Sequence, residues 1–319
     1  MHIGYYMHME KNKFKSDLLR TTKLLTYILV YYALCITLSF ITKYFISEQG
    51  YNFRFPIFKS AITNMCHFLG ALAILIYRGE NRKYEQPQQT LACAVIGSVD
   101  IGIGIHILRQ VDLAFYTIIK SATPVFILLS GFVLGTEKVS FFTLLSILLI
   151  AFGTYLVTVK PIPTNNMDIY LLVGSAIVSG FRWSFIQFIL SKKKSNVYIA
   201  IRDLCLPTSL LLFVYAFKVY GVREILESSF FDTYRHTLVT MTIISILGFA
   251  SLAVLVCELV IVKKTSVLFL SISAVIKELI IVGVSITRGD TCMTKLNYLG
   301  IVISILGILL YNGVKYKKI

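Results

Sequence analysis

Residues 139–159 read VSFFTLLSILLIAFGTYLVTV, and residues 296–314 read LNYLGIVISILGILLYNGV. Each stretch is about as long as a helix that crosses a bilayer, and neither contains a charged residue. The whole chain of 319 residues is 56% hydrophobic and 15% charged, whereas soluble domains are about 45–50% apolar and about 25% charged. Because a soluble fold of this size could not bury so much apolar surface, we expect a membrane protein. The unbroken apolar runs favour helices over a transmembrane β-barrel.

Outward from these two stretches, the same pattern predicts ten membrane-spanning helices joined by short connections. Only Lys263 and Lys264 separate the eighth span from the ninth. The predicted spans are Leu24 to Ile41, Ile57 to Tyr77, Thr90 to Ile107, Leu113 to Leu134, Val139 to Val159, Asp168 to Leu190, Tyr198 to Phe217, Thr237 to Val262, Thr265 to Thr287 and Leu296 to Val314.

Ten spans divide into two halves of five, residues 24–159 and 160–314, flanked by tails at 1–23 and 315–319. Five is an odd number, so the second half would enter the membrane from the opposite side. Inverted repeats of this kind are a common plan of transporters, which hold the substrate near the middle of the membrane. The expected fold is therefore all-α, with a 5+5 inverted repeat.

The net charge of +15 is distributed unevenly across the predicted membrane. The side that holds both termini carries 17 Lys and Arg residues, and the opposite loops carry nine. The positive-inside rule places both termini in the cytosol. We interpret the basic charge as a topology signal and a contact for anionic lipid, with no role in binding nucleic acid.

The chain ends in Lys315-Tyr316-Lys317-Lys318-Ile319, which fits a K-x-K-x-x retrieval signal read by coat proteins. The alternative is a basic flank that ends the last span. Lys315 and Lys317 would carry the signal.

Familiar enzyme and metal motifs are missing from the sequence. The six cysteines include no C-x-x-C pair, which leaves little support for a metal site or a disulfide framework. There is no G-x-S-x-G, no H-E-x-x-H and no P-loop. The chain is therefore not expected to be an enzyme or to carry a cofactor.

Two lysines near the middle of spans are the strongest indication of function. Lys120 lies in the fourth span and Lys277 in the ninth, its counterpart in the other half. A charge at mid-bilayer costs about 2.5–3.5 kcal/mol on insertion scales, so such groups usually face a polar cavity. The alternative is that both are held in internal ion pairs with Asp100, Glu258 or Glu278.

Helical spacing selects the companions of these lysines. Tyr116 and Thr117 lie one turn before Lys120, and Ser273 lies one turn before Lys277. Pro124, one turn after Lys120, removes a backbone hydrogen bond and frees a carbonyl. This face offers a ring for stacking, a hydroxyl and a cation.

Other polar residues within spans have two interpretations each. Arg182 could grip phosphate with its bidentate guanidinium or form a structural pair with Asp100 or Glu258. Asn64 and His67 share one face of the second span, where His67 is either a ligand contact or a packing residue. Glu278 is adjacent to Lys277 and would bind a sugar or pair with another helix. We expect Asp100, Glu258, His67 and Asn64 to form a supporting polar network.

Three longer motifs resemble a known family. They are YTIIKSATPVFILLSGFVLGTEK at 116–138, SGFRWSFIQ at 179–187 and CELVIVKKTSVLFLSISAVIKE at 257–278. Together they resemble the nucleotide-sugar transporter and triose-phosphate translocator family of the drug/metabolite transporter superfamily. The strongest similarity is to solute carrier family 35, subfamily C, the proteins that look like GDP-fucose transporters.

This resemblance implies ten helices, cytosolic termini and a Golgi or endoplasmic-reticulum membrane. In the plastid branch of the family a lysine of span 4 and a Lys-Arg pair of span 9 bind phosphate. Lys120 and Lys277 match these lysines, and Glu278 stands where that branch has arginine. The resemblance therefore implies an antiporter that exchanges a nucleotide sugar for a nucleoside monophosphate. The alternatives are a sugar-phosphate/phosphate exchanger and a transporter-like regulator of glycosylation that transports nothing.

Overall fold

The computed structural model describes residues 22, 26–80, 87–111, 113–120, 123–136, 140–158, 166–191, 196–287 and 294–316. All regular structure in these residues is helical. An N-terminal helix spans Thr26–Ile46. It is followed by α2 (Pro56–Tyr77), α3 (Pro87–Gln110), α4 (Leu113–Lys120), α5 (Thr123–Val133), α6 (Phe141–Thr158), α7 (Asn166–Ser191), α8 (Val197–Tyr220), α9 (Val222–Leu226), α10 (Tyr234–Lys264), α11 (Val267–Thr287) and α12 (Lys295–Tyr316).

Local signals set several of the helix ends. Pro56 occupies the first turn of α2, where a missing N–H breaks no intrahelical bond. Asn196 caps α8, and its side-chain oxygen accepts a hydrogen bond from the Tyr198 amide at 3.2 Å. Gly221, with φ +76°, ends the same helix in a conformation that side chains rarely adopt. The helices thus begin and end where the sequence chemistry favours it.

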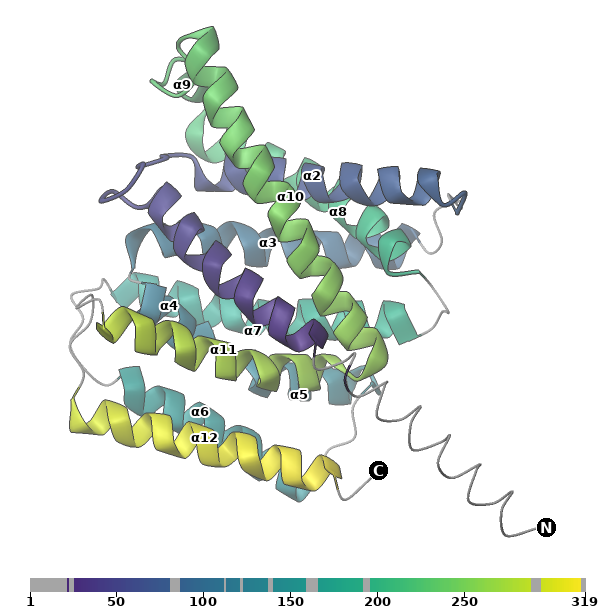
Figure 1. Cartoon of the computed structure of the whole chain (residues 1–319), viewed down its shortest axis with the longest axis vertical. Coiled ribbons are helices and arrows are strands. Elements are labelled where there is room, and N and C mark those ends of the chain that lie inside the picture. Colours follow the sequence, from purple (N-terminus) through teal and green to yellow (C-terminus); the bar gives the residue numbers. More distant parts are fainter. Residues whose placement is uncertain are drawn as a thin grey trace.

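The helices run side by side as a bundle, and α12 ends on the side where the N-terminal helix begins (Figure 1). The start of Thr26–Ile46 and the end of α12 lie on the right of this view, and the end of Thr26–Ile46 and the start of α2 lie on the left. We call the left end the distal side. This agrees with an even number of crossings, with α4 and α5 counted together as one.

Several contacts join helices that would be counterparts in the two predicted halves. Helix α2 packs against α8, α4 against α11, and α6 against α12 (Figure 1). These are spans 2 and 7, 4 and 9, and 5 and 10. Two halves related by a pseudo-two-fold axis through the bundle would produce this pairing, so it supports the repeat that the sequence predicts.

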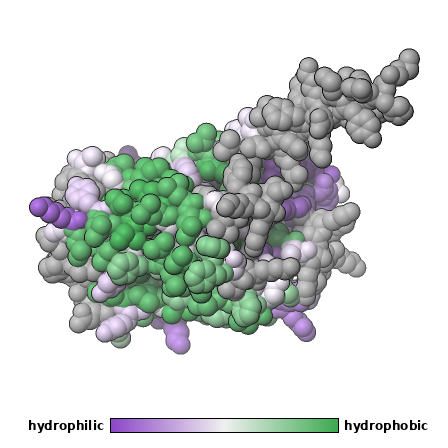
Figure 2. Space-filling view, turned by 90° about the horizontal axis from the view of Figure 1, so that it is seen from below, coloured by the Kyte–Doolittle hydropathy of each residue, from purple (hydrophilic) through white to green (hydrophobic). Residues whose placement is uncertain are grey.

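The outer face is apolar, as a lipid-facing surface must be. Seen from the side of α6 and α12, the molecule presents a broad hydrophobic area with hydrophilic residues at its edges (Figure 2). Phe141, Leu148 and Phe152 of α6 and Val302 and Leu309 of α12 are all more than half exposed. Six of the described helices are long and apolar enough to cross a membrane by length and composition. The prediction of an all-helical membrane protein is confirmed.

The fourth predicted span is described as α4 and α5, on either side of residues 121–122, which lie outside the described residues. One detail differs from the predicted spans. A short helix, α9, and an early start of α10 at Tyr234 replace part of the loop expected before the eighth span. The end of α10 at Lys264 confirms the predicted boundary between spans 8 and 9.

Candidate functional site

A cavity of about 410 Å³ lies at the centre of the bundle. Its lining comes from both halves of the chain, including α3, α4, α5, α7, α10, α11 and the N-terminal helix. We call it the central cavity. Its charged and aromatic lining residues are Tyr31, Asp100, Tyr116, Lys120, Arg182, Trp183, Glu258 and Lys277.

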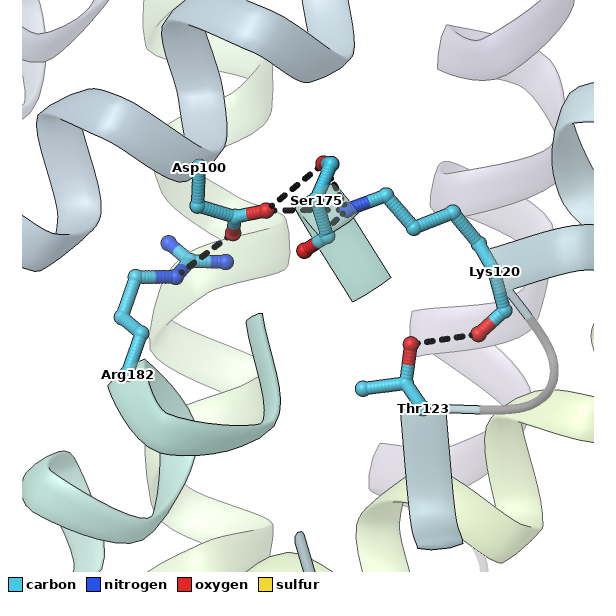
Figure 3. A network of polar contacts seen from close by, with 5 residues as sticks. All are labelled: Asp100, Lys120, Thr123, Ser175 and Arg182. Carbon is cyan, nitrogen blue, oxygen red and sulfur yellow. Dashed lines mark hydrogen bonds and ion pairs between the residues drawn. The ribbon is translucent and has the colours of Figure 1, made fainter. Parts of the chain in front are cut away.

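Asp100 organises one wall of the central cavity (Figure 3). Its Oδ1 accepts a hydrogen bond from Lys120 Nζ at 2.8 Å, and its Oδ2 lies 3.0 Å from Arg182 Nε. Ser175 completes the group: its Oγ lies 2.7 Å from Lys120 Nζ and 3.1 Å from Asp100 Oδ1. Asp100 is only 3% exposed, so its charge depends on these cations. Four residues from α3, α4 and α7 therefore form one connected network.

Two glycines of α3 make room for these cations. A Cβ at Gly97 would lie 3.3 Å from Arg182 Cδ. A Cβ at Gly104 would lie 3.0 Å from the Tyr116 hydroxyl and 4.0 Å from Lys120 Cε. Because residues 97, 100 and 104 share one face of the helix, the glycines let both cations reach Asp100. These glycines thus serve close packing.

Lys120 occupies a position where the helix needs a replacement hydrogen bond. Pro124 cannot donate to the carbonyl of Lys120, and the Thr123 hydroxyl donates to that carbonyl at 2.5 Å instead (Figure 3). This is the carbonyl that the sequence predicts to be freed. Thr123 and Pro124 also line the central cavity, so this replacement of a backbone hydrogen bond by a side-chain hydrogen bond lies at the cavity wall.

Lys277 occupies the opposite wall. Its Nζ lies 5.6 Å from the centre of the Tyr31 ring and 3.6 Å from Cys35 Sγ, both on the N-terminal helix. Glu258 of α10 is hydrogen-bonded by Tyr31 and lies within electrostatic reach of Lys277 and Arg182. Lys277 thus has an aromatic face and a nearby carboxylate beside the cavity.

The sequence left two alternatives for Lys120, a place in a polar cavity or an internal ion pair, and the structure shows both. Lys120 pairs with Asp100, and it also lines the central cavity. Arg182 likewise contacts Asp100, yet lines the cavity and lies 5.2 Å above the Trp183 ring. Tyr116 lines the cavity beside Lys120 as expected.

The remaining predicted residues lie elsewhere or lack a description. Ser273 faces the N-terminal helix, where its hydroxyl lies 2.7 Å from Tyr32 Oη, and it is not among the residues that line the central cavity. Asn64 donates to the Ser60 carbonyl at 2.9 Å, and His67 Nε2 lies 2.8 Å from Ser251 Oγ. The side chains of Thr117, Glu278 and Lys315 and the whole of Lys317 lie outside the described residues.

Three polar features escaped the sequence reasoning. Lys59 is buried in the first turn of α2, at 7% exposure. Ser175 is fully buried against Lys120, but a serine in an apolar span carries no signal that separates it from a packing residue. Arg202 and Asp203 form a buried pair within α8, with Nε and Oδ1 2.7 Å apart. Lys59 and Arg202 could have been found from the sequence, because each is a charged residue inside a predicted span.

The arrangement can bind an anion and offers no reacting group. Lys120, Arg182 and Lys277 are set against Asp100 and Glu258, which leaves one excess positive charge among these five cavity residues. Among the residues that the structure describes, no cluster of His, Cys, Asp and Glu could hold a metal ion.

Over nearly the whole chain, residues 22–312 match the Triose-phosphate Transporter family. The chain belongs to this family. It is a multi-pass membrane transporter rather than an enzyme.

The proteins similar in sequence are named either as sugar phosphate/phosphate translocators or as nucleotide-sugar transporters. A probable sugar phosphate/phosphate translocator of Arabidopsis thaliana is 24% identical over 95% of this chain and 75% of its own length. A second such protein of that plant is 25% identical over 92% of this chain and 86% of its own length. The candidate nucleotide-sugar transporter YMD8 of Saccharomyces cerevisiae is 25% identical over 72% of this chain and 67% of its own.

The fold itself has a solved counterpart. One crystal structure aligns with a TM-score of 0.62 at 13% identity, covering 92% of this chain and 98% of the other. At this identity the likeness concerns the fold alone, and it confirms the all-helical architecture.

Proposed function

We propose that this protein is an antiporter that exchanges a nucleotide sugar for a nucleoside monophosphate by alternating access. One observation carries the proposal: Lys120 and Lys277, from different halves of the chain, line the same central cavity. A cavity between two halves is where transporters of this plan hold their substrate. Its volume of about 410 Å³ falls in the range of small-molecule sites.

The lining chemistry suits an organic phosphate. Ammonium and guanidinium groups bind phosphoryl oxygens, and Arg182 can do so with two parallel hydrogen bonds. Tyr31, Tyr116 and Trp183 offer aromatic surface for a flat or sugar moiety. Lys120 and Lys277 would bind the phosphates, and Tyr116 and Thr117 would shape the neighbouring subsite. Glu278, which the sequence adds to the site, would act from α11, whereas Ser273 would act only through Tyr32, which its hydroxyl contacts.

Asp100 would act as the internal counter-ion of the empty carrier. It holds Lys120 and Arg182 in the network of Figure 3, and an arriving phosphate would compete for both cations. The two lining carboxylates do not balance the three cations of the central cavity. Closing the cavity without an anion would then bury an uncompensated charge, which is costly, so transport would proceed as exchange.

Purified protein in liposomes tests this proposal directly. Vesicles loaded with a nucleoside monophosphate should take up the matching nucleotide sugar, and empty vesicles should not. Lys277→Ala should abolish exchange without loss of folded protein, whereas Lys218→Ala, which removes an exposed lysine at the end of α8, should leave it unchanged. Equal uptake into empty vesicles would refute obligatory exchange, and an active Lys277→Ala variant would refute the role of this lysine.

A sugar-phosphate/phosphate exchanger is the second candidate. The names of the plant relatives favour it, and the same cations would bind the phosphate. Inorganic phosphate that competes at low concentration and drives uptake from the opposite side would decide for this candidate. Folded protein that neither nucleotide sugars nor sugar phosphates stabilise would instead indicate a regulator without transport activity.

For its location we propose a Golgi or endoplasmic-reticulum membrane with both termini in the cytosol. The unequal distribution of basic residues supports this orientation, as does the shared side of the start of the N-terminal helix and the end of α12. Coat proteins would read Lys315 and Lys317. Replacing both by serine should shift a tagged protein toward later compartments, and unchanged retention in the early secretory pathway would show that the tail is only a basic flank.

A further inference from the structure

Beside the central cavity lies a second, smaller one of about 260 Å³. It is bounded by α2, α3, α7, α8, α10 and the N-terminal helix, and we call it the side pocket. The two cavities share the lining residues Ser60, Ile101, Arg182, Ile186 and Leu255, so they are adjacent and have part of their wall in common. A molecule bound in the central cavity could therefore extend into the side pocket.

Lys59 is the charged group that this pocket adds. It lies in the first turn of α2 and is 7% exposed, although the ordinary place for a lysine near a helix end is the membrane surface. Among the described residues, no acceptor or carboxylate forms a hydrogen bond or ion pair with its ammonium group. An uncompensated buried ammonium is costly, because desolvation is not offset by a partner.

A second orphaned group lies on the same face of α2. Thr63, one turn after Lys59, is also part of the pocket wall, and its buried hydroxyl has no hydrogen-bond partner among the described residues. His67 follows one turn later, within electrostatic reach of Lys59, and contacts Ser251 through Nε2. Residues 59, 63 and 67 thus form a stripe of donors along one helix face.

The charge of the side pocket is of one sign. Lys59 and Arg182 line it together with hydroxyls, one amide and one imidazole, and none of its lining residues is Asp or Glu. Buried polar groups without partners are rare in folded proteins and commonly indicate a missing ligand. An anionic oxygen is the ligand that would neutralise a buried ammonium group and accept a hydrogen bond from a hydroxyl.

We propose that the side pocket is a second anion subsite, in which Lys59 and Thr63 bind a carboxylate or phosphoryl group carried by the same substrate whose phosphate lies between Lys120 and Lys277. This rests on the proposed function and narrows it. The substrates would carry two separated anionic groups, as an acidic sugar nucleotide or a sugar bisphosphate does. A neutral sugar would leave Lys59 uncompensated and bind less tightly.

A first experiment tests the subsite without any organic substrate. Inorganic phosphate is added to purified Lys277→Gln protein, in which the central site is impaired, and thermal stability is measured. Phosphate should still raise the melting temperature, and the additional change Lys59→Gln should remove that rise. The matched control is Lys218→Gln in the same background, which should keep it. No stabilisation of Lys277→Gln by phosphate, or a rise that survives Lys59→Gln, would overturn the subsite.

A second experiment compares substrates that differ in one group only. UDP-glucuronate is set against UDP-glucose, and glucose 1,6-bisphosphate against glucose 6-phosphate, in binding to the wild-type protein and to Lys59→Met. In the pair that binds, the more acidic member should bind more tightly to the wild type, and Lys59→Met should weaken it about ten-fold or more. The less acidic member should change little.

The outcomes separate this inference from the proposed function. Equal affinity within a binding pair, or an acidic preference that survives Lys59→Met, would overturn the subsite while leaving transport intact. If no member of either pair binds, the proposed function fails for UDP-sugars and glucose phosphates, and the phosphate experiment alone decides on the subsite. A structural role of Lys59 predicts a less stable ligand-free Lys59→Met protein, whereas the subsite predicts one at least as stable as the wild type, because an uncompensated charge has been removed.

Discussion

At the scale of single residues, Asp100 is the centre of the charge arrangement. One buried carboxylate of α3 contacts Lys120 of α4 and both Arg182 and Ser175 of α7. Removing one partner of a buried ion pair is strongly destabilising because it leaves the remaining charge uncompensated. In this protein two cations would lose their counter-ion at once, so the residue should matter for stability as well as for binding.

Asp100→Asn should therefore lower the free energy of unfolding by about 3–5 kcal/mol, which is measured as a lower melting temperature in detergent. Adding Lys120→Met should recover part of that loss, because one of the orphaned cations is then gone. The control is Glu227→Gln, which breaks an exposed pair with Arg223 of similar length, 2.7 Å, and should change little. Strictly additive losses in the double variant would contradict a shared counter-ion.

At the scale of helices, small residues let neighbouring elements approach closely in the membrane. A Cβ at Gly153 of α6 would come within 2.6 Å of the Gly300 carbonyl oxygen, and one at Gly307 of α12 within 2.8 Å of the Ser146 carbonyl oxygen. Helix–helix association in lipid depends on such close packing, since no hydrophobic driving force acts between helices there. The α6–α12 pair is thus fixed by its glycines and is remote from the central cavity.

Gly307→Val should separate α6 from α12 and destabilise the protein by about 1–3 kcal/mol, the usual range for overpacking. The melting temperature should fall, while the affinity of the folded fraction for substrate should stay the same. Gly174→Val in α7 is the matched control, because a Cβ there meets nothing within 4 Å. If both variants lose the same stability, helix propensity rather than the α6–α12 contact would be responsible.

At the scale of the whole molecule, a side chain on the distal side of the bundle joins the N-terminal helix to the end of α3. Lys43, near the end of the N-terminal helix, donates to the Leu108 carbonyl at 2.8 Å and to the Val111 carbonyl at 2.6 Å. These carbonyls lie at the C-terminal end of α3, where the helix leaves its acceptors unsatisfied. A hollow that holds Lys120, Lys277 and Cys35 extends toward Leu108 on this side. Lys43 thus links the N-terminal helix to α3 at the distal end of this hollow.

Lys43→Met should loosen this link and populate a state that is open on the distal side. In a variant that retains Cys35 as its only cysteine, a membrane-impermeant maleimide added from that side should label Cys35 faster when Lys43 is replaced. Lys218→Met, on the same side of the bundle, should leave the rate unchanged. An identical labelling rate with and without Lys43 would exclude it as part of a gate.

Much of the architecture follows from the sequence alone. Unbroken apolar runs of about 20 residues predict spanning helices because backbone groups must bond internally in lipid, and the described helices agree with the predicted spans. The same energetic reasoning selects Lys120, Arg182 and Lys277, because charges are too costly in a span without a polar environment, and all three line the central cavity. Pro124 also predicts the freed carbonyl that Thr123 satisfies.

Only the tertiary structure decides which of these charges meet. Asp100 could have paired with any of several cations, and the glycines at 97 and 104 bring Lys120 and Arg182 to it. Ser273 and Ser175 look alike in the sequence, yet Ser273 faces Tyr32 and Ser175 faces Lys120. Lys59 sits so near a helix end that the sequence permits it to reach the surface. Its burial depends on how α2 packs against its neighbours, because the cost of a charge is set by local surroundings that only the assembled bundle creates.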